Sequence, residues 1–145
     1  MGIDIQALKL LKISYDRSGA FKKTLTIGRQ GVHAPKQAIS VLLNAESYEL
    51  EPFCESLFIN FLGSSEVDSI DASSYENATI VHDLNKPFDT DKKYDTIFDG
   101  GCLEHIYNVP QALKTISQLC NVGGDRKSTR LNSSHVSESR MPSSA

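Results

Sequence analysis

Three short runs of β-favouring residues, each closed by an aspartate, constrain the fold of this chain more than any other feature. They cover, in chain order, residues 67–71, 78–83 and 94–99. An earlier run of the same kind, residues 24–27, ends at Gly28. Each run has the length and composition of a strand bounded by turn residues. We therefore expect four strands.

Segments with apolar residues at helical spacing are interleaved with these runs. They cover roughly residues 3–14, 34–43, 51–63 and 109–120. Three of the segments have a proline close to the first helical position, where proline is favoured. Strands that alternate with helices predict a parallel α/β sheet with helices on both faces.

Composition excludes several classes of function. Hydrophobic residues are 39% of the 145 residues, and no apolar run approaches the roughly 20 residues of a membrane helix. We expect no membrane partner and, because no secretory signal is visible, a cytoplasmic location. The formal charge is -3 and the basic residues form no stripe, so we expect no nucleic-acid partner. Cys54, Cys102 and Cys120 form no CxxC pair, so we expect reduced thiols.

The residues that follow each strand are the candidates for a ligand site. In open parallel sheets, ligands bind beyond the carboxyl ends of the strands. A carboxylate after the second strand, here Asp71, can accept hydrogen bonds from both hydroxyls of a ribose. A glycine after the first strand, here Gly28, lets the backbone approach a ligand closely. The sequence therefore predicts a nucleoside site.

The order of these elements resembles that of the class I S-adenosylmethionine-dependent methyltransferases, over about residues 24–124. The most specific stretch is YDTIFDGGCLEHI, residues 94–106, which is similar to the family's fourth strand and the "LEHI"-like turn after it. The segment NVGG, residues 121–124, is similar to the "kpGG" that precedes the family's fifth strand. The resemblance implies methyl transfer from S-adenosylmethionine to a small-molecule acceptor that the sequence does not identify.

The resemblance also implies roles for individual residues. Gly28 and Gly31 would belong to the cofactor loop after the first strand, and Asp71 would bind the ribose. The other cofactor contacts would be Asp83 and Leu84 beside the adenine, and Asp99, Gly100 and Gly101 beside the transferred methyl group. Glu104 and His105 are the nearest candidates for a general base, which an acceptor hydroxyl or ammonium would need.

Composition changes abruptly after Gly124. Residues 125–145 are rich in serine and resemble the in-frame translation of a common short-read sequencing adapter. We expect this stretch to be a disordered, non-native tail, and residues 1–124 to be an incomplete methyltransferase-like domain. The sheet would then have the strand order 3-2-1-4 and be truncated before the fifth strand. We expect the parent protein to be the active enzyme and this chain to be inactive.

An alternative remains open because the first loop departs from the family pattern. That loop usually reads DxGxGxG, whereas residues 27–32 here read IGRQGV. The alternative is a non-catalytic Rossmann-like scaffold or interaction module that has lost cofactor binding. The side chain of Arg29 discriminates between the two. If it points away and the backbone of Gly28 is free, a cofactor can enter; if it fills the crevice, the scaffold is favoured.

For three more specific hypotheses, the residues that the chemistry requires are not present at the required spacing. A nicotinamide-dependent oxidoreductase expects GxGxxG after the first strand and an acid about 20 residues later, whereas Asp71 lies much further from Gly28. Cys102 and His105 have no orienting acid or oxyanion loop for nucleophilic catalysis. The four residues that could be considered for a metal site are His33, His82, Asp83 and His105. They show no metal-ligand spacing, so we predict no metal.

Overall fold

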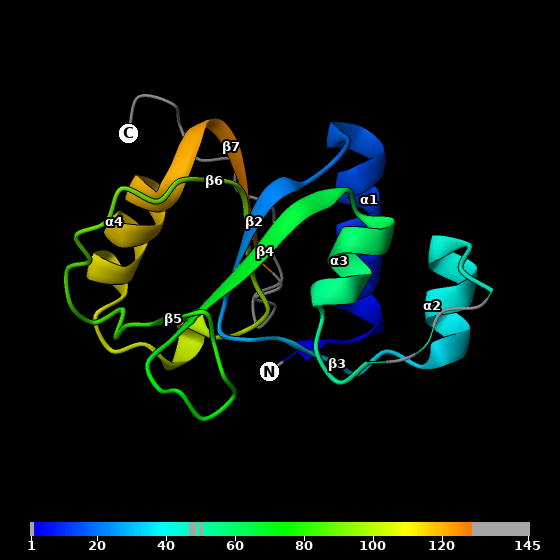
Figure 1. The fold of residues 1–145 in the computed structure, drawn as a ribbon, viewed down its shortest axis with the longest axis horizontal. Coiled ribbons are helices and arrows are strands. Elements are labelled where there is room, and N and C mark those ends of the chain that lie inside the picture. Colours follow the sequence, from blue (N-terminus) through cyan, green and yellow to red (C-terminus); the bar gives the residue numbers. More distant parts are fainter. Residues whose placement is uncertain (1, 47–48, 50, 129–145) are drawn as a thin grey trace.

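Five parallel strands form the central sheet of the computed structural model, which describes residues 2–46, 49 and 51–128 (Figure 1). The strands are β2 (Lys22–Ile27), β4 (Ser64–Asp71), β5 (Ile80–Val81), β6 (Tyr94–Asp99) and β7 (Cys120–Ser128). Their order across the sheet is β5-β4-β2-β6-β7. The predicted α/β class and the neighbours in the order 3-2-1-4 are thus confirmed, and the fold is Rossmann-like in kind.

The expectation that the sheet stops before a fifth strand is wrong. Strand β7 pairs in parallel with β6, in a register that runs from Thr96 opposite Asp125 to Asp99 opposite Ser128. It therefore includes residues 125–128, so the prediction that a disordered tail begins at residue 125 is wrong for these four residues. Pairing at a sheet edge uses backbone groups, so a serine-rich and charged segment can join it without an apolar pattern. Residues 129–145 lie outside the described residues, and the adapter origin of the tail stays a prediction.

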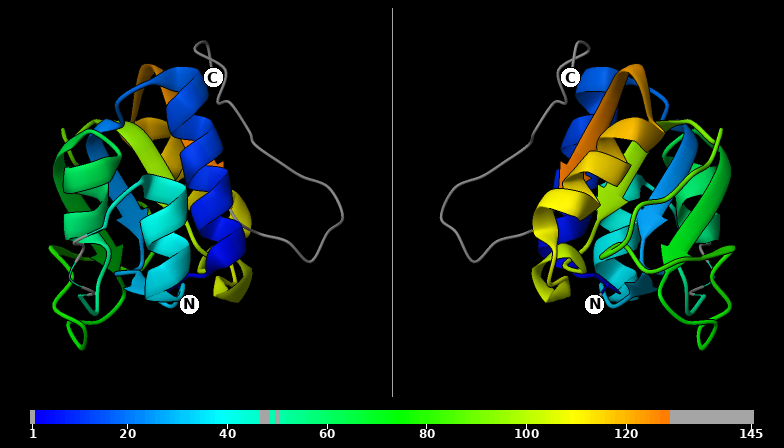
Figure 2. Two further views of the ribbon diagram at one scale, coloured as in Figure 1. Left: turned by 90° about the vertical axis from the view of Figure 1, so that its right-hand side faces the viewer. Right: turned by 90° about the vertical axis from the view of Figure 1, so that its left-hand side faces the viewer.

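Helices cover both faces of the sheet (Figures 1 and 2). They are α1 (Ile5–Ser18), α2 (Lys36–Leu43), α3 (Glu55–Phe61) and α4 (Val109–Leu119). The first three lie on one face and α4 lies on the other, as Figure 1 shows. A single 3-10 turn, η1 (Leu103–His105), follows β6. Within the described residues, none of the helices combines the length and apolar character needed to cross a membrane.

Capping side chains explain where two of the helices begin. The carboxylate of Asp4 accepts a hydrogen bond of 2.8 Å from the N–H of Ala7, at the first turn of α1. The side chain of Asn108 accepts one of 3.2 Å from the N–H of Gln111, and Pro110 occupies the first turn of α4. Each cap accepts a hydrogen bond from an N–H group that has no partner within its helix. Proline is tolerated in the first turn because the N–H that it lacks would have no intrahelical acceptor.

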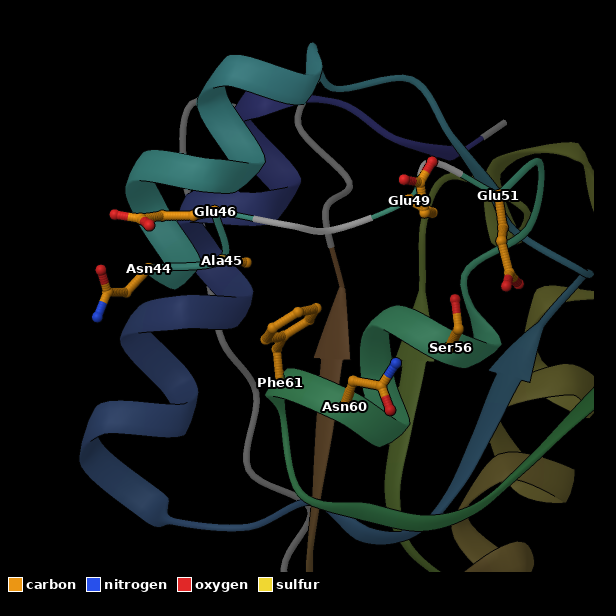
Figure 3. A pocket seen from close by; sticks show the side chains of 8 residues that line it. All are labelled: Asn44, Ala45, Glu46, Glu49, Glu51, Ser56, Asn60 and Phe61. Carbon is orange, nitrogen blue, oxygen red and sulfur yellow. The ribbon is translucent and has the colours of Figure 1, made fainter.

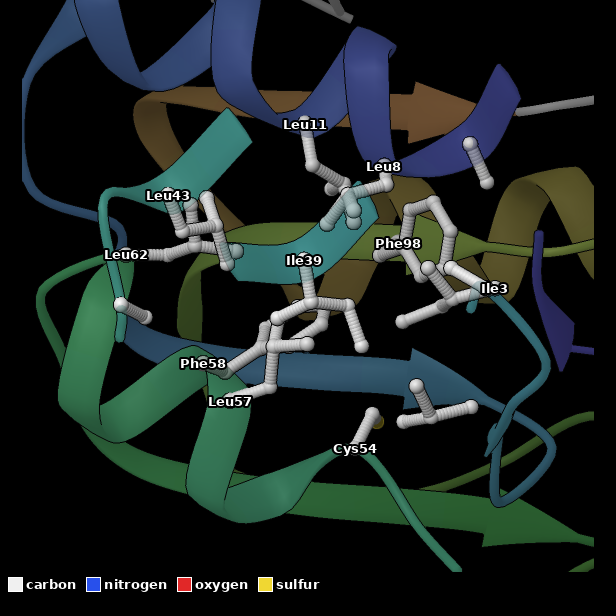
Figure 4. Packing of buried hydrophobic residues seen from close by; sticks show 14 of the residues in the cluster. Ile3, Leu8, Leu11, Ile39, Leu43, Cys54, Leu57, Phe58, Leu62 and Phe98 are labelled. Atoms are coloured by element: carbon white, nitrogen blue, oxygen red, sulfur yellow. The ribbon is translucent and has the colours of Figure 1, made fainter. Parts of the chain in front are cut away.

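A chain of aromatic rings fills the core between the sheet and helices α1 to α3. Phe58 of α3 lies at its centre, with ring centroids 6.0 Å from Phe21 and 5.8 Å from Phe98. Tyr15 extends the chain from α1, 6.4 Å from Phe21. Figure 4 shows Phe58 and Phe98 among the aliphatic side chains of the same cluster. This packing holds Phe98, near the carboxyl end of β6, in one place.

The opposite face of the sheet packs against α4. Leu25 and Ile27 of β2 and Ile97 of β6 are fully buried there, together with Ile116 of α4. The amphipathic spacing in residues 109–120 predicted this packing. Strands β2 and β6 are therefore covered on both faces, which makes their carboxyl ends a rigid base for a site.

A second, two-stranded sheet was not predicted. Strand β1 (Gly2–Ile3) pairs in parallel with β3 (Gly31–Val32), just after the loop that follows β2. Ile3 is fully buried and lies beside Phe98 in Figure 4. Strands of two residues carry no periodicity that a sequence pattern could reveal. Their pairing ties the first loop to the amino-terminal segment.

Candidate functional site

Three of the predicted site residues lie at the ends of three adjacent strands. In the sheet, Ile27 of β2 is opposite Ile70 of β4 on one side and Asp99 of β6 on the other. Gly28 and Asp71 directly follow Ile27 and Ile70. Because the sheet order reverses at β2, this is the switch point where open α/β sheets bind ligands. The structure thus brings Gly28, Asp71 and Asp99 to the same edge.

The two predicted glycines of the first loop have different surroundings. Gly28 adopts a φ of 75°, which favours glycine, and its N–H donates to the carbonyl oxygen of Ile70 at 2.7 Å. Gly31 is paired with Gly2 in the small sheet. A side chain on Gly31 would also lie 3.2 Å from the ring of His33. Gly28 therefore lies where β2 and β4 end, whereas Gly31 is engaged by the amino-terminal strand.

Asp71 presents an available carboxylate at the end of β4. The residue is half-buried, and its main-chain oxygen accepts a hydrogen bond of 2.8 Å from the N–H of His82. None of the described residues donates a hydrogen bond to its carboxylate. A half-buried carboxylate without internal donors is well suited to accept two hydroxyls of a ligand.

Asp83 and Leu84, which we predicted beside an adenine, have structural partners. The Oδ1 atom of Asp83 accepts hydrogen bonds of 2.9 Å from the main-chain N–H and from the side-chain amide of Asn85. These bonds lower the pKa of Asp83, because they favour its charged form. Leu84 is 6% exposed and packs in the core beneath α4. Both residues shape the loop between β5 and β6.

The carboxylate of Asp99 organises the turn after β6. Its Oδ1 atom accepts from the N–H groups of Gly101, Cys102 and Leu103, at 3.2, 2.7 and 3.3 Å. Asp99 is 1% exposed, and the three donors compensate for its burial. Gly101 has a φ of 108°, which the turn requires. Asp99 therefore stabilises the turn that follows β6.

Gln30 is a site residue that the sequence analysis did not identify. It is fully buried, and its Nε2 atom donates to the carbonyl oxygens of Ile27 at 2.6 Å and Gly28 at 3.5 Å. A Cβ atom on Gly100 would lie 2.4 Å from Gln30 Oε1. The side-chain amide thus occupies the space between the first loop and Gly100. No pattern distinguishes this glutamine from a surface residue, so only the fold reveals it.

Arg29 does not occupy the space between the first loop and Gly100. Its Nε atom donates to Glu55 Oε1 at 2.8 Å, and a second guanidinium nitrogen donates to the main-chain oxygen of Glu76 at 2.8 Å. The guanidinium also lies over the ring of Phe53, 4.0 Å from its centroid. The charge of Arg29 is therefore balanced by Glu55, and the arginine connects the first loop to α3 and to the loop between β4 and β5.

Glu104 and His105, the predicted general-base candidates, lie on η1 at the rim of the same edge. Their side chains are 41% and 75% exposed, and His105 Nε2 is 3.7 Å from Glu104 Oε1. Such an exposed pair contributes little to stability. Both side chains are therefore accessible from solvent.

The pKa of the Cys102 thiol is raised to about 11, first by burial and then by the negative charges of Asp99 and Asp71. Only a thiolate reacts with iodoacetamide, so the raised pKa shifts the reaction to higher pH. We expect Cys102 at pH 8 to react at least about tenfold more slowly than in the urea-unfolded chain, and the rate to rise up to about pH 11. Peptide mass spectrometry measures this site by site. Equal rates in the folded and unfolded chain would contradict the described burial.

Two pockets around α2 contain none of the predicted site residues. One, of about 410 Å³, lies between α2 and α3 and is lined by Glu46, Glu49 and Glu51 among others (Figure 3). The second, of about 530 Å³, lies along α2 and includes Lys36 and Val41. Among the described residues, no group of three or more histidine, cysteine or acidic side chains could hold a metal ion.

No protein-family model matches this chain. The search of curated proteins likewise found no significant match.

Proposed function

We propose that the protein transfers the methyl group of S-adenosylmethionine to a small-molecule acceptor. The observation that carries the proposal is the convergence of Gly28, Asp71 and Asp99 at the switch point of a parallel sheet. Their places in the element order match those that the resemblance to class I methyltransferases implies. The proposal concerns the activity of the parent protein, and a cytoplasmic setting belongs to it.

The residues at this edge fit the cofactor in two respects. The carboxylate of Asp71 has no donor among the described residues, so it is free to accept both ribose hydroxyls. The positive charge of Arg29 is neutralised by Glu55 at 2.8 Å, which reduces its repulsion of a cationic sulfonium. The neutralisation of Arg29 favours a positively charged nucleoside ligand over a phosphorylated one.

Bound S-adenosylmethionine would supply a methyl group on a positively charged sulfur. The contribution of the chain would be positioning and exclusion of water, because displacement at such a methyl group needs no covalent catalyst. Glu104 and His105 would accept a proton from an acceptor hydroxyl or ammonium. Their exposure at the rim allows that proton to pass to solvent.

A non-catalytic scaffold is the second candidate, and a specific observation favours it. The side chain of Gln30 fills the space between the first loop and Gly100, and the N–H of Gly28 is already bonded to Ile70. If Gln30 filled this space permanently, no room would be left for a cofactor. In that case the loops at this edge would serve only to stabilise the sheet.

Titration calorimetry distinguishes the two candidates. We expect micromolar binding of S-adenosylmethionine, weakened about 100-fold or more in Asp71→Ala, because two hydrogen bonds to a charged group are lost. The matched control is Asp91→Ala, an exposed aspartate in the loop between β5 and β6, which we expect to leave the affinity unchanged. The titration is made on the parent protein, and absence of binding to a parent protein that melts cooperatively would exclude the enzyme and favour the scaffold.

A further inference from the structure

The side-chain amide of Gln30 has a defined orientation. Its Nε2 atom faces the carbonyl oxygens of Ile27 and Gly28, at 2.6 and 3.5 Å. Both of those groups can only accept hydrogen bonds, so the amide nitrogen and not the amide oxygen must face them. The oxygen, Oε1, is therefore directed to the opposite side, towards Gly100.

The Oε1 atom of Gln30 is buried and has no hydrogen-bond partner among the described residues. Burial of an unpaired amide oxygen is unfavourable, and the oxygen would regain a partner if the side chain turned out to solvent. The hydrogen bonds of Nε2 thus stabilise the buried position of Gln30, whereas the unpaired Oε1 destabilises it. We therefore expect a stronger donor to the same carbonyl oxygens to displace the side chain.

We propose that Gln30 is a plug that a ligand amino group displaces from the carbonyl oxygens of Ile27 and Gly28. The inference rests on the proposed cofactor and names the part of it that this position recognises. The amino-acid portion of S-adenosylmethionine carries an ammonium group, which donates N–H bonds as Nε2 does. A charged donor forms stronger bonds to a carbonyl than a neutral amide, so it competes successfully for the same acceptors.

The competition makes Gln30 a determinant of ligand specificity. A ligand with an amino group must displace the plug, and its apparent affinity is reduced by the fraction of molecules in which the plug is closed. A nucleoside that lacks the amino-acid portion does not need these carbonyls. Methylthioadenosine is such a ligand, because it carries the adenosine and the sulfur but no amino group.

The test is calorimetric titration of S-adenosylmethionine and of methylthioadenosine into the full chain and three variants. We expect Gln30→Ala to bind S-adenosylmethionine about tenfold more tightly, with no change for methylthioadenosine. Gln30→Met keeps the length of the side chain but cannot donate, and we expect it to tighten the same ligand. Gln37→Ala, an exposed glutamine on α2, is the control and should match the wild type. Circular dichroism and a thermal melt verify that each variant is folded.

Each outcome supports or overturns the plug. An equal gain for both ligands, an unchanged affinity, or a weaker affinity for S-adenosylmethionine in both Gln30 variants overturns it while the cofactor proposal stands. If no folded protein in the series, the wild type included, binds either ligand, the cofactor proposal fails and the plug fails with it. A selective gain in Gln30→Ala and Gln30→Met supports both.

Discussion

Phe58→Ala is expected to lower the free energy of unfolding by about 3–5 kcal/mol, the usual loss when a buried phenylalanine is truncated. Phe58 is fully buried and joins the rings of Phe21 and Phe98, so its removal leaves a cavity at the centre of the aromatic chain. A domain of this size is typically stable by about 5–15 kcal/mol, so much of its stability would be lost. Urea unfolding followed by circular dichroism measures the change.

The matched control for Phe58→Ala lies next to it on α3. Ile59 is 48% exposed, so Ile59→Ala removes little buried surface, and we expect a loss below about 1 kcal/mol. Phe58→Ala alters the buried face of α3, and Ile59→Ala alters its exposed face. If Phe58→Ala cost no more than Ile59→Ala, the packing of α3 against the sheet would have to differ from the one described.

Gly63→Ala is expected to lower the free energy of unfolding by about 3 kcal/mol, nearly as much as Phe58→Ala. Gly63 follows α3 with a φ of 70°, a conformation in which alanine is strained. A Cβ atom there would lie 2.6 Å from the Cβ and 2.8 Å from the Cα of Ala20. The segment cannot easily move away, because the N–H of Phe21 donates to Leu62 and that of Lys22 donates to Gly63. Strain and collision therefore add.

A double-mutant cycle separates these two contributions. Ala20 is exposed, so Ala20→Gly alone should cost little, but in the Gly63→Ala background it removes the nearest colliding atom. We expect the pair of substitutions to recover at least about 1 kcal/mol relative to additivity, as measured by urea unfolding. Strictly additive effects would mean that backbone strain and the contact with the Cα of Ala20, and not the contact with its Cβ, account for the loss.

Strong local patterns predicted most of the sheet. Residues 94–99 form a continuous β-favouring run between a lysine and a glycine, and β6 has the same bounds in the structure. Strand β7 was missed because its residues 120–128 have no apolar alternation, and its pairing depends on the open edge of β6. The small sheet of β1 and β3 was missed because it needs Gly2 and Gly31 to meet from distant parts of the chain.

The candidate site was predicted only in its outline. Strand ends can be located from sequence, so the sequence predicts Asp71 and Asp99 as site residues. The hydrogen bonds of these two aspartates cannot be predicted from sequence. In the structure, Asp99 accepts hydrogen bonds from the turn that follows it, whereas Asp71 has no donor among the described residues. The place of Gln30 depends on the direction of one side chain, which no spacing rule predicts.

The central position of β2 has a consequence for how the chain reaches its fold. The partners of β2 come from much later in the sequence: Thr24 meets Ser64 across 40 residues, and Lys23 meets Asp95 across 72. Such high contact order requires large loops to close first, so folding should take roughly milliseconds to seconds rather than microseconds. During synthesis, both edges of β2 remain unpaired until β4 and β6 have been made. In this interval the unpaired edges expose the nascent chain to association with other chains.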